Sequence, residues 1–593
     1  MTIKQKKGTL CLALAGLFVL SCGGQPDRGS RAAAKDDVAL ALAVAQEYVD
    51  AYFHQFPEEA SMCGYRNPPL DRFGDHSPAA LATWRAREDA WLETLRSIDP
   101  NTLEGTEAAV PHAFVRELLE AERELRVCRV ELWSVNPAWP AWQELLPVEF
   151  AHQTVGTDQA RAAVLARGRD VARFIDTEIA NLREGLSEGY VAPRSGVEAV
   201  LEVITNLLEG PPKESPFYDP AVRDGSEDFA ASLLLVVTDE INPAICRYHE
   251  FLTKEYLPAA RDSIAATETP GGQACYAAAI RFYTSMSLSP EEIHETGLRE
   301  MERLHEEMRV LGRRSFGIDD PAELLQHVRN APNYRFASEQ EILVYARAAV
   351  ERGRAAVPDW FGFVPEASVV VEAYPKYLKR TGAGQYVVGS PDDDEPATYK
   401  IGTYDPTSLG KAEIEAVTFH ETYPGHHLQV AVSFEGDRLH PALQYFWVEG
   451  VGEGWALYSE RLADEMGLYS SDLSEVGRLS NEAMRAARLV VDPGMHALGW
   501  TRQQAIDYML ENTSLSEGQA VYEIDRYIAN PAQAVSYMIG CLEIQRLRRL
   551  AEERLGDRFD IRAFHDAIIE DGAVPVEMLR RKIKGWIERK QEG

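Results

Sequence analysis

Apolar side chains recur at every third or fourth position through most of the chain from residue 38 onward. An α-helix has about 3.6 residues per turn, so this spacing gives each helix one apolar stripe that can be buried. We therefore expect a mainly α fold. The pattern predicts helices over residues 38–54, 80–98, 107–129, 158–186, 290–311 and 340–357.

One interval, residues 367–404, has a different pattern. Short runs of β-branched and aromatic residues cover 368–372, 385–389 and 397–401, and clusters of Gly, Pro and Asp separate them. Such runs are typical of strands, so we predict a small antiparallel sheet just before a helix that starts at about residue 410. The acidic run 392–395 is interpreted as a solvated turn, with a calcium site as the alternative.

The start of the chain has the pattern of a secretory leader. Three lysines precede an apolar run over residues 10–20, which ends at Ser21 and Cys22. About ten apolar residues are too few to span a bilayer, which needs about 20. A cysteine in this place resembles the bacterial lipoprotein box. The resemblance implies a signal peptide over residues 1–21, acylation of Cys22 and a flexible tether up to residue 37. We expect a cell-envelope lipoprotein of the outer membrane facing the periplasm; an ordinary signal peptide is the alternative.

The rest of the chain, residues 38–593, is expected to form a single large helical domain, as one body or as two lobes. A composition of 45% hydrophobic and 26% charged residues is typical of globular proteins. The 93 acidic and 61 basic side chains give a formal net charge of −32. This charge argues against a nucleic-acid binder, because phosphate recognition depends on clustered Lys and Arg.

The cysteine spacing argues against a cysteine-ligated zinc site. Five cysteines remain after the leader and the acylated position, and no two of them form a C-x-x-C pair. An oxidising compartment permits disulfides, and we predict one between Cys246 and Cys275.

The segment that carries chemistry lies within about residues 365–540. Its histidines His420, His426 and His427 lie within eight residues, with Glu421 beside the first, in a chain that has 14 histidines. Zinc binds imidazole and carboxylate groups, and catalytic sites typically use three such ligands. In the HExxH pattern, two histidines one helical turn apart share the metal and the glutamate acts as general base.

This chain departs from that pattern, because Pro424 stands where the second histidine would be. On a straight helix, neither later histidine could share a metal with the first. Proline has no N–H for the preceding turn, and Gly425 tolerates unusual dihedral angles. We therefore expect a kink at this step that brings either His426 or His427 back toward His420.

A second acidic pattern follows thirty-three residues after the first histidine. Glu449, Glu453 and Glu460 fall near one face of an otherwise aromatic and apolar helix. Carboxylates in such a place are costly unless they bind a cation or a hydrogen-bond donor. We predict Glu453 as the third ligand of one Zn²⁺ ion, with a structural ion pair as the alternative. Another divalent metal fits the same ligand types.

Residues 420–429 and 453–460 closely resemble the bacterial domain-of-unknown-function 885 family, and the similarity runs from about residue 40 to 590. That family resembles the helical gluzincin metallopeptidases, such as thimet oligopeptidase, carboxypeptidase Taq and angiotensin-converting enzyme. The resemblance implies a large, cleft-containing, metallopeptidase-like helical fold. In the first two enzymes the liganding Glu precedes another Glu by seven positions, as Glu453 precedes Glu460 here. The inserted residues after His420 depart from those relatives and leave the second histidine ligand open.

Relatives of this kind place a Tyr or His from a later helix against the oxyanion of peptide hydrolysis. By that resemblance, Tyr537 and His496 are candidates for this catalytic role, with packing and capping as the alternatives. Arg526 and Tyr527 are candidates for substrate binding, and Arg526 would hold a substrate carboxylate through a bidentate pair.

These observations predict a zinc-dependent hydrolase of peptide or similar amide bonds. Glu421 would take a proton from the attacking water and return it to the leaving amine. The expected partners are a peptide or small amide substrate, and the membrane through the N-terminal lipid alone. Two alternatives remain open: a non-catalytic cell-envelope binding module on the same scaffold, and a metal-dependent hydrolase of a non-peptide amide or ester.

Overall fold

The computed structural model describes residues 28–592 except 66, 139–140, 375–380, 390–395 and 436–438. The predicted signal peptide, Cys22 and the acidic run 392–395 lie outside the described residues. Within them, the predicted mainly α fold with a small sheet is confirmed, and a helix covers nearly all of each of the six predicted ranges.

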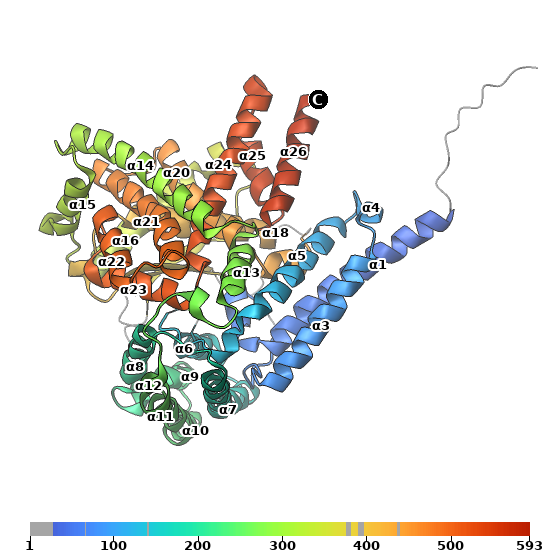
Figure 1. Ribbon diagram of the computed structural model, residues 1–593, viewed down its shortest axis with the longest axis vertical. Coiled ribbons are helices and arrows are strands. Elements are labelled where there is room, and N and C mark those ends of the chain that lie inside the picture. Colours follow the sequence, from blue (N-terminus) through green and yellow to red (C-terminus); the bar gives the residue numbers. More distant parts are fainter. Residues whose placement is uncertain are drawn as a thin grey trace, which may run out of the picture.

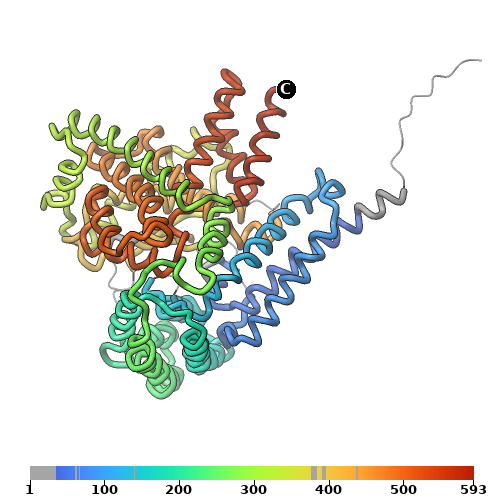
Figure 2. The backbone as a smooth tube through the Cα atoms, viewed as in Figure 1, coloured from blue at the N-terminus to red at the C-terminus, as the bar shows by residue number. Residues whose placement is uncertain are grey.

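Three long helices of the first part of the chain pack against one another, and they lie on the right of Figure 1 and in blue in Figure 2. Their bounds are α1 (Arg28–Gln55), α3 (Pro78–Ser97) and α5 (Ala109–Leu125), with short α2 (Ala60–Cys63) and α4 (Pro100–Leu103) between them. The apolar stripe of α3 buries Trp84, Trp91, Leu92 and Leu95, as its spacing predicts.

The next helices form a lobe with an apolar cluster of its own, seen at the bottom of Figure 1. They are α6 (Trp142–His152), α7 (Asp158–Glu188), α8 (Arg194–Leu208), α9 (Asp219–Asp224), α10 (Glu227–Val236), α11 (Asn242–Phe251) and α12 (Leu257–Ala259). The continuous helical run Glu227–Ala259 is long and apolar enough to cross a membrane, by length and composition only. A core helix passes the same test, and Leu233, Ile241 and Leu252 of this run are fully buried in the lobe.

The remaining helices form the main body, whose apolar cluster also includes side chains of α1, α3 and α5. They are α13 (Gly272–Thr284), α14 (Pro290–Ser315), α15 (Pro321–Asn330), α16 (Glu339–Trp360), α17 (Ile414–Glu421), α18 (His426–Glu435), α19 (Pro441–Tyr445), α20 (Glu449–Glu465), α21 (Asp472–His496), α22 (Arg502–Asn512), α23 (Glu517–Ala529), α24 (Ser536–Leu555), α25 (Ile561–Ile569) and α26 (Val576–Glu592).

Helix α14 shows how local sequence forms these elements. Ser289 and Glu292 make a capping box at its start, which satisfies backbone N–H groups that the helix leaves free. Its buried residues then recur at intervals of three and four and face α21. Gly297 permits the close contact, because a Cβ there would lie 2.7 Å from Cβ of Leu489.

Helices α20 and α24 also cross at very short distance. A Cβ on Gly540 of α24 would lie 1.5 Å from the carbonyl oxygen of Gly450 in α20, and a Cβ on Gly454 would lie 2.5 Å from the carbonyl carbon of Gly540. Only glycine fits at such a crossing. Tyr537 lies three residues before Gly540 on α24, and Glu453 precedes Gly454 on α20.

The small sheet has the order β1 (Val369–Ala373), β3 (Ala397–Thr403), β2 (Thr381–Val387). β2 and β3 are antiparallel, but β1 lies on the other side of β3 and runs parallel to it. The prediction of an all-antiparallel sheet was therefore wrong, because the first strand pairs with the third rather than with its neighbour in the chain. The sheet packs on α16 and α17.

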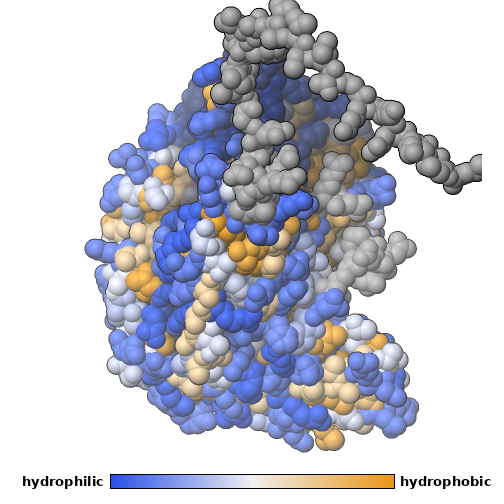
Figure 3. Space-filling view, turned by 90° about the vertical axis from the view of Figure 1, so that its right-hand side faces the viewer, coloured by the Kyte–Doolittle hydropathy of each residue, from blue (hydrophilic) through white to orange (hydrophobic). Residues whose placement is uncertain are grey.

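The surface seen in Figure 3 is largely hydrophilic, with apolar residues in small separate groups. This distribution agrees with the composition, in which 26% of the residues are charged. Scattered exposed apolar residues are normal on a folded protein.

Candidate metal centre

The first histidine helix ends where the sequence predicts a kink. Helix α17 stops at Glu421, and α18 begins at His426, so the chain turns between them. The backbone N–H of Gly425 donates to the carbonyl oxygen of Phe419 at 3.0 Å. A Cβ on Gly425 would lie 1.9 Å from the carbonyl oxygen of His420, so this tight return requires glycine.

The return brings two imidazoles onto one carboxylate. Nε2 of His420 and Nε2 of His426 each lie 3.3 Å from Oε2 of Glu453, which projects from α20. The two rings are perpendicular, with centroids 4.9 Å apart. Among the described residues, these three form the one group whose ligand atoms all lie within 4.8 Å of one another and could hold a metal ion.

The chemistry of this group fits zinc. Two ligand atoms of a tetrahedral zinc site, each about 2.0–2.1 Å from the ion, are about 3.3 Å apart. Oε2 of Glu453 is buried, and no described residue hydrogen-bonds it. A buried carboxylate oxygen without a donor is costly unless a cation balances it. Three protein ligands are also the number that catalytic zinc sites typically use.

A further carboxylate orients the first ligand. Nδ1 of His420 lies 2.9 Å from Oε1 of Glu460, seven residues after Glu453 on α20. A proton on Nδ1 shared with this carboxylate leaves the lone pair of Nε2 free for a metal, as in carboxylate–histidine–zinc arrangements. Nη2 of Arg485 lies 3.5 Å from the same oxygen and partly balances its charge.

Electrostatics favour positive charge at this place. Burial alone would lower the pKa of His420, but the nearby Glu453 and Glu460 carboxylates outweigh it and raise the pKa to about 9. Burial would likewise raise the pKa of Glu453, but the His426 and His420 imidazoles hold it well below its ordinary value. The same carboxylates that hold a proton on an imidazole would attract a divalent cation.

Glu421 is buried beside the cluster. Its Oε2 accepts a hydrogen bond of 2.8 Å from the backbone N–H of Tyr386 in β2. The sheet therefore orients the carboxylate that the sequence predicts as general base.

Tyr537 lies next to the first ligand. Its ring is stacked on His420, with centroids 6.3 Å apart and planes 19° apart. The guanidinium carbon of Arg488 lies 4.5 Å from the centroid of the Tyr537 ring. The side chain is partly exposed.

The structure places His427 outside the cluster, so His426 is the second candidate ligand. Nε2 of His427 lies 3.0 Å from the Tyr423 hydroxyl and 3.1 Å from the carbonyl oxygen of Ala367, and Nδ1 lies 3.3 Å from the Tyr386 hydroxyl. Burial lowers the pKa of His427 to about 4, so the ring is neutral and structural.

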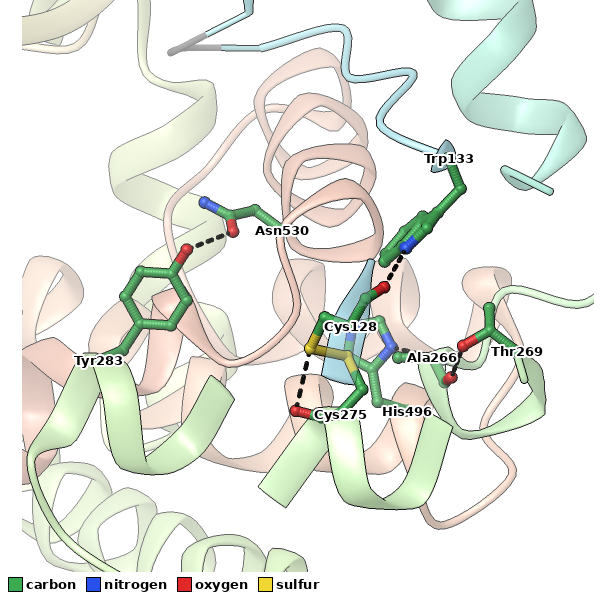
Figure 4. Close-up of a disulfide and its surroundings, with 8 residues drawn as sticks. All are labelled: Cys128, Trp133, Ala266, Thr269, Cys275, Tyr283, His496 and Asn530. Atoms are coloured by element: carbon green, nitrogen blue, oxygen red, sulfur yellow. Dashed lines mark hydrogen bonds between the residues drawn. A yellow bond between two sulfur atoms is a disulfide. The ribbon is translucent and has the colours of Figure 1, made fainter. Parts of the chain in front are cut away.

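His496, predicted as a catalytic residue, is also a structural residue. Its Nδ1 accepts from the backbone N–H of Ala266 at 3.1 Å, and its Nε2 lies 3.0 Å from the carbonyl oxygen of Tyr527. Figure 4 shows the ring beside a disulfide. Both ring nitrogens are engaged and the side chain is fully buried, which excludes contact with a substrate.

That disulfide joins Cys128 and Cys275 rather than the predicted pair (Figure 4). Cys246 lies on an exposed part of α11 in the other lobe and is free. Cys128 follows α5, which packs against α13, the helix that carries Cys275. The pairing is thus decided by helix packing across 147 residues of sequence.

Arg526 and Tyr527 belong to an internal network instead of an open binding site. Arg526 donates to Glu523 at 3.1 Å and to Gln533 at 2.7 Å. Tyr527 is fully buried; its hydroxyl donates to Glu523 and accepts from Nε of Arg488 at 2.7 Å. The guanidinium charge of Arg526 is already paired, so the structure offers no bidentate site for a substrate carboxylate there.

Two neighbours of the cluster escaped the sequence reasoning. The Trp447 ring lies 5.4 Å from that of His426, and Arg488 packs on Tyr537. Three arginines at 478, 485 and 488 of the buried helix α21 were a signal that could have been used. Buried guanidinium groups require acidic or aromatic partners. Here Arg485 contacts Glu460 and Arg488 packs on Tyr537, both next to the candidate metal centre.

The comparisons with known proteins agree with this fold. Over residues 57–583, the sequence matches the family described as "Bacterial protein of unknown function (DUF885)". A crystal structure described as a "putative lipoprotein" from Colwellia psychrerythraea superposes with a TM-score of 0.85 at 25% identity, over 94% of this chain and 99% of that one. A "putative lipoprotein of unknown function" from Shewanella oneidensis has a TM-score of 0.70 at 17% identity, over 91% and 98% of the two chains, and shows the same fold. No curated protein matches the chain. The chain therefore belongs to the DUF885 family of bacterial proteins.

Proposed function

We propose that this protein is a zinc-dependent hydrolase of peptide bonds. The observation that carries the proposal is the convergence of two Nε2 atoms at 3.3 Å on one buried, otherwise unbonded carboxylate oxygen, with a further carboxylate beside them. His420, His426 and Glu453 would hold the ion. When bound, it supplies a Lewis acid that polarises a carbonyl group and lowers the pKa of water.

The protein side chains supply the proton transfers and the orientation. Glu421, held by the N–H of Tyr386, takes the proton from the attacking water and returns it to the amine as the C–N bond breaks. The hydroxyl of Tyr537 would donate a hydrogen bond to the oxygen on which negative charge develops. Glu460 keeps His420 in the tautomer whose Nε2 faces Glu453.

The cellular setting is part of the proposal. The leader and Cys22 have the pattern of a lipoprotein, and two structures with this fold are described with that word. We place the enzyme in the cell envelope, on the periplasmic face of the outer membrane, held by its N-terminal lipid. The substrate is a peptide or small amide, and the net charge of −32 disfavours nucleic acid.

The test measures metal content and peptide hydrolysis on the purified protein. We expect about one equivalent of zinc and release of new amines from a mixed peptide pool. Glu421→Gln should keep the zinc and lower turnover by at least about 100-fold, because it removes the general base but no ligand. Glu511→Gln, an exposed carboxylate at the end of α22, is the matched control. Absence of zinc after supplementation, or full turnover by Glu421→Gln, would refute the proposal.

A further inference from the structure

A cavity of about 130 Å³ lies beside the metal centre, between α5, α13 and the start of α20. Glu117, Arg281, Tyr283, Trp447 and Glu449 are among the residues that line it. The volume is several times the 10–15 Å³ that one water requires, so a small group of atoms fits.

The cavity and the metal centre share a wall. The Trp447 ring, which lines the cavity, lies 5.4 Å from the ring of His426. Glu449 stands four residues before Glu453 on α20, and side chains at this spacing lie on one face with Cβ atoms about 5–6 Å apart. A ligand in the cavity therefore contacts side chains that are themselves neighbours of the candidate metal ligands.

The charged groups that line the cavity are unequally paired. The one cation that lines it, Arg281, is already paired: Nη2 lies 2.8 Å from Glu117 and Nε lies 3.3 Å from Glu124. Glu449 has a neutral partner, the side-chain amide of Gln533 at 3.2 Å. Among the described residues Glu449 therefore forms no ion pair, and its carboxyl group suits a cationic ligand better than an anionic one.

The side chain of Glu449 is partly buried at the start of α20. It is held in place by Gln533, from the turn whose Asn530 accepts a hydrogen bond of 2.8 Å from the Tyr283 hydroxyl (Figure 4).

We propose that Glu449 binds the free α-ammonium group of a peptide substrate, so that the enzyme removes residues from the N-terminus. This inference rests on the proposed hydrolase function and specifies its substrate. The α-nitrogen and the carbonyl carbon of one residue are about 2.5 Å apart. An ammonium group at Glu449 therefore leaves the first peptide bond next to Glu453. A lysine side chain in the cavity would instead place its own carbonyl farther away.

The experiment compares a peptide with a free N-terminus and the same peptide N-acetylated, using the zinc-loaded full-length protein. We expect kcat/KM to be about 100-fold higher for the free peptide, with release of the first residue as an amino acid. Glu449→Gln should lower kcat/KM for the free peptide by a similar factor and leave the acetylated peptide unchanged, because it removes one partner of a buried charge pair. Glu553→Gln, an exposed residue of α24, is the control and should change neither value.

Several outcomes would overturn the inference. These are equal rates for the two peptides, an equal loss on both in Glu449→Gln, or preferred cleavage beside an internal lysine. If neither peptide is cleaved, the proposed hydrolase fails, and the amine site is judged by binding alone. Calorimetry with L-alaninamide and N-acetyl-L-alaninamide should then show binding of the first only, lost in Glu449→Gln. Equal binding of both amides would refute the amine site.

Discussion

Replacing each of two adjacent histidines by alanine tests the metal centre most directly. His426 and His427 are neighbours, and both side chains are buried, at 5% and 0% exposure. Both replacements remove the same atoms from the interior. They differ in one respect, because Nε2 of His426 faces Glu453 and both ring nitrogens of His427 face other partners.

The structure allows the size of the difference to be worked out. Zinc bound by four protein ligands contributes about 10–16 kcal/mol, or about 2.5–4 kcal/mol for each ligand. Loss of one ligand therefore weakens zinc binding by about 70- to 900-fold. At free zinc 100 times the wild-type Kd, wild type gains about 2.7 kcal/mol of stability, whereas His426→Ala gains at most about 0.5 kcal/mol. His427→Ala should keep the zinc gain and lose about 2–4 kcal/mol of metal-free stability, through the lost hydrogen bonds and the cavity left behind.

Competition with a chromophoric chelator measures the zinc Kd of wild type and of the two variants. Thermal unfolding with and without zinc measures the gain in stability. We expect a zinc-dependent upward shift for wild type and His427→Ala, and almost none for His426→Ala. Unchanged affinity in His426→Ala together with lost affinity in His427→Ala would show that the chain around Pro424 is arranged differently from this structure and would refute the reasoning.

Three further predictions concern groups around the centre and in the core. Glu460→Gln should weaken zinc binding by about 10- to 100-fold without removing a ligand, since it loosens His420; a chelator titration checks this. Gly540→Ala should destabilise the protein by at least about 3 kcal/mol, because the added Cβ would lie 1.5 Å from a carbonyl oxygen. The control is Gly518→Ala on α23, where no atom lies within 4 Å of the added Cβ; it should be neutral or stabilise the protein by up to about 1 kcal/mol. Urea unfolding of both variants measures the difference. Burial lowers the pKa of His565 to about 3, below its unfolded value of about 6.5. The unfolded chain therefore binds this proton first, and stability present above pH 6.5 should fall by about 4 kcal/mol as pH decreases toward 3. His565→Gln should make that slope shallower in unfolding curves at pH 7, 6, 5 and 4, and an unchanged slope would contradict the assignment.

Much of the fold could be predicted because helix formation depends on residues that are close together in the sequence. The stripe of α3, with Trp84, Trp91 and Leu95 buried, follows directly from residues three and four positions apart. The strand segments were likewise predicted from runs of β-branched residues, but their order was not. Whether β1 pairs with β2 or with β3 depends on how the intervening chain passes over the sheet, which no local pattern records.

The candidate site divides in the same way. Histidine and glutamate side chains within eight residues, followed by a second glutamate pattern, are enough to predict a cation site and the residue types that form it. The partners of the more distant candidates could not be predicted. His496 and Tyr527 have side chains suited to catalysis, but helix packing engages them with Ala266 and with Glu523 inside the core.

By itself, the sequence determined the helical composition, the acidic charge and the residue types of the candidate centre, because these depend on residue identity and short spacing. The tertiary structure decided that His426 and not His427 meets Glu453, that Cys275 pairs with Cys128, and that Tyr537 rests against His420. The physical reason is that such contacts join atoms from separate helices. Their positions are set by close packing at glycines such as Gly425 and Gly540, where a shift of about 1 Å changes which atoms can meet.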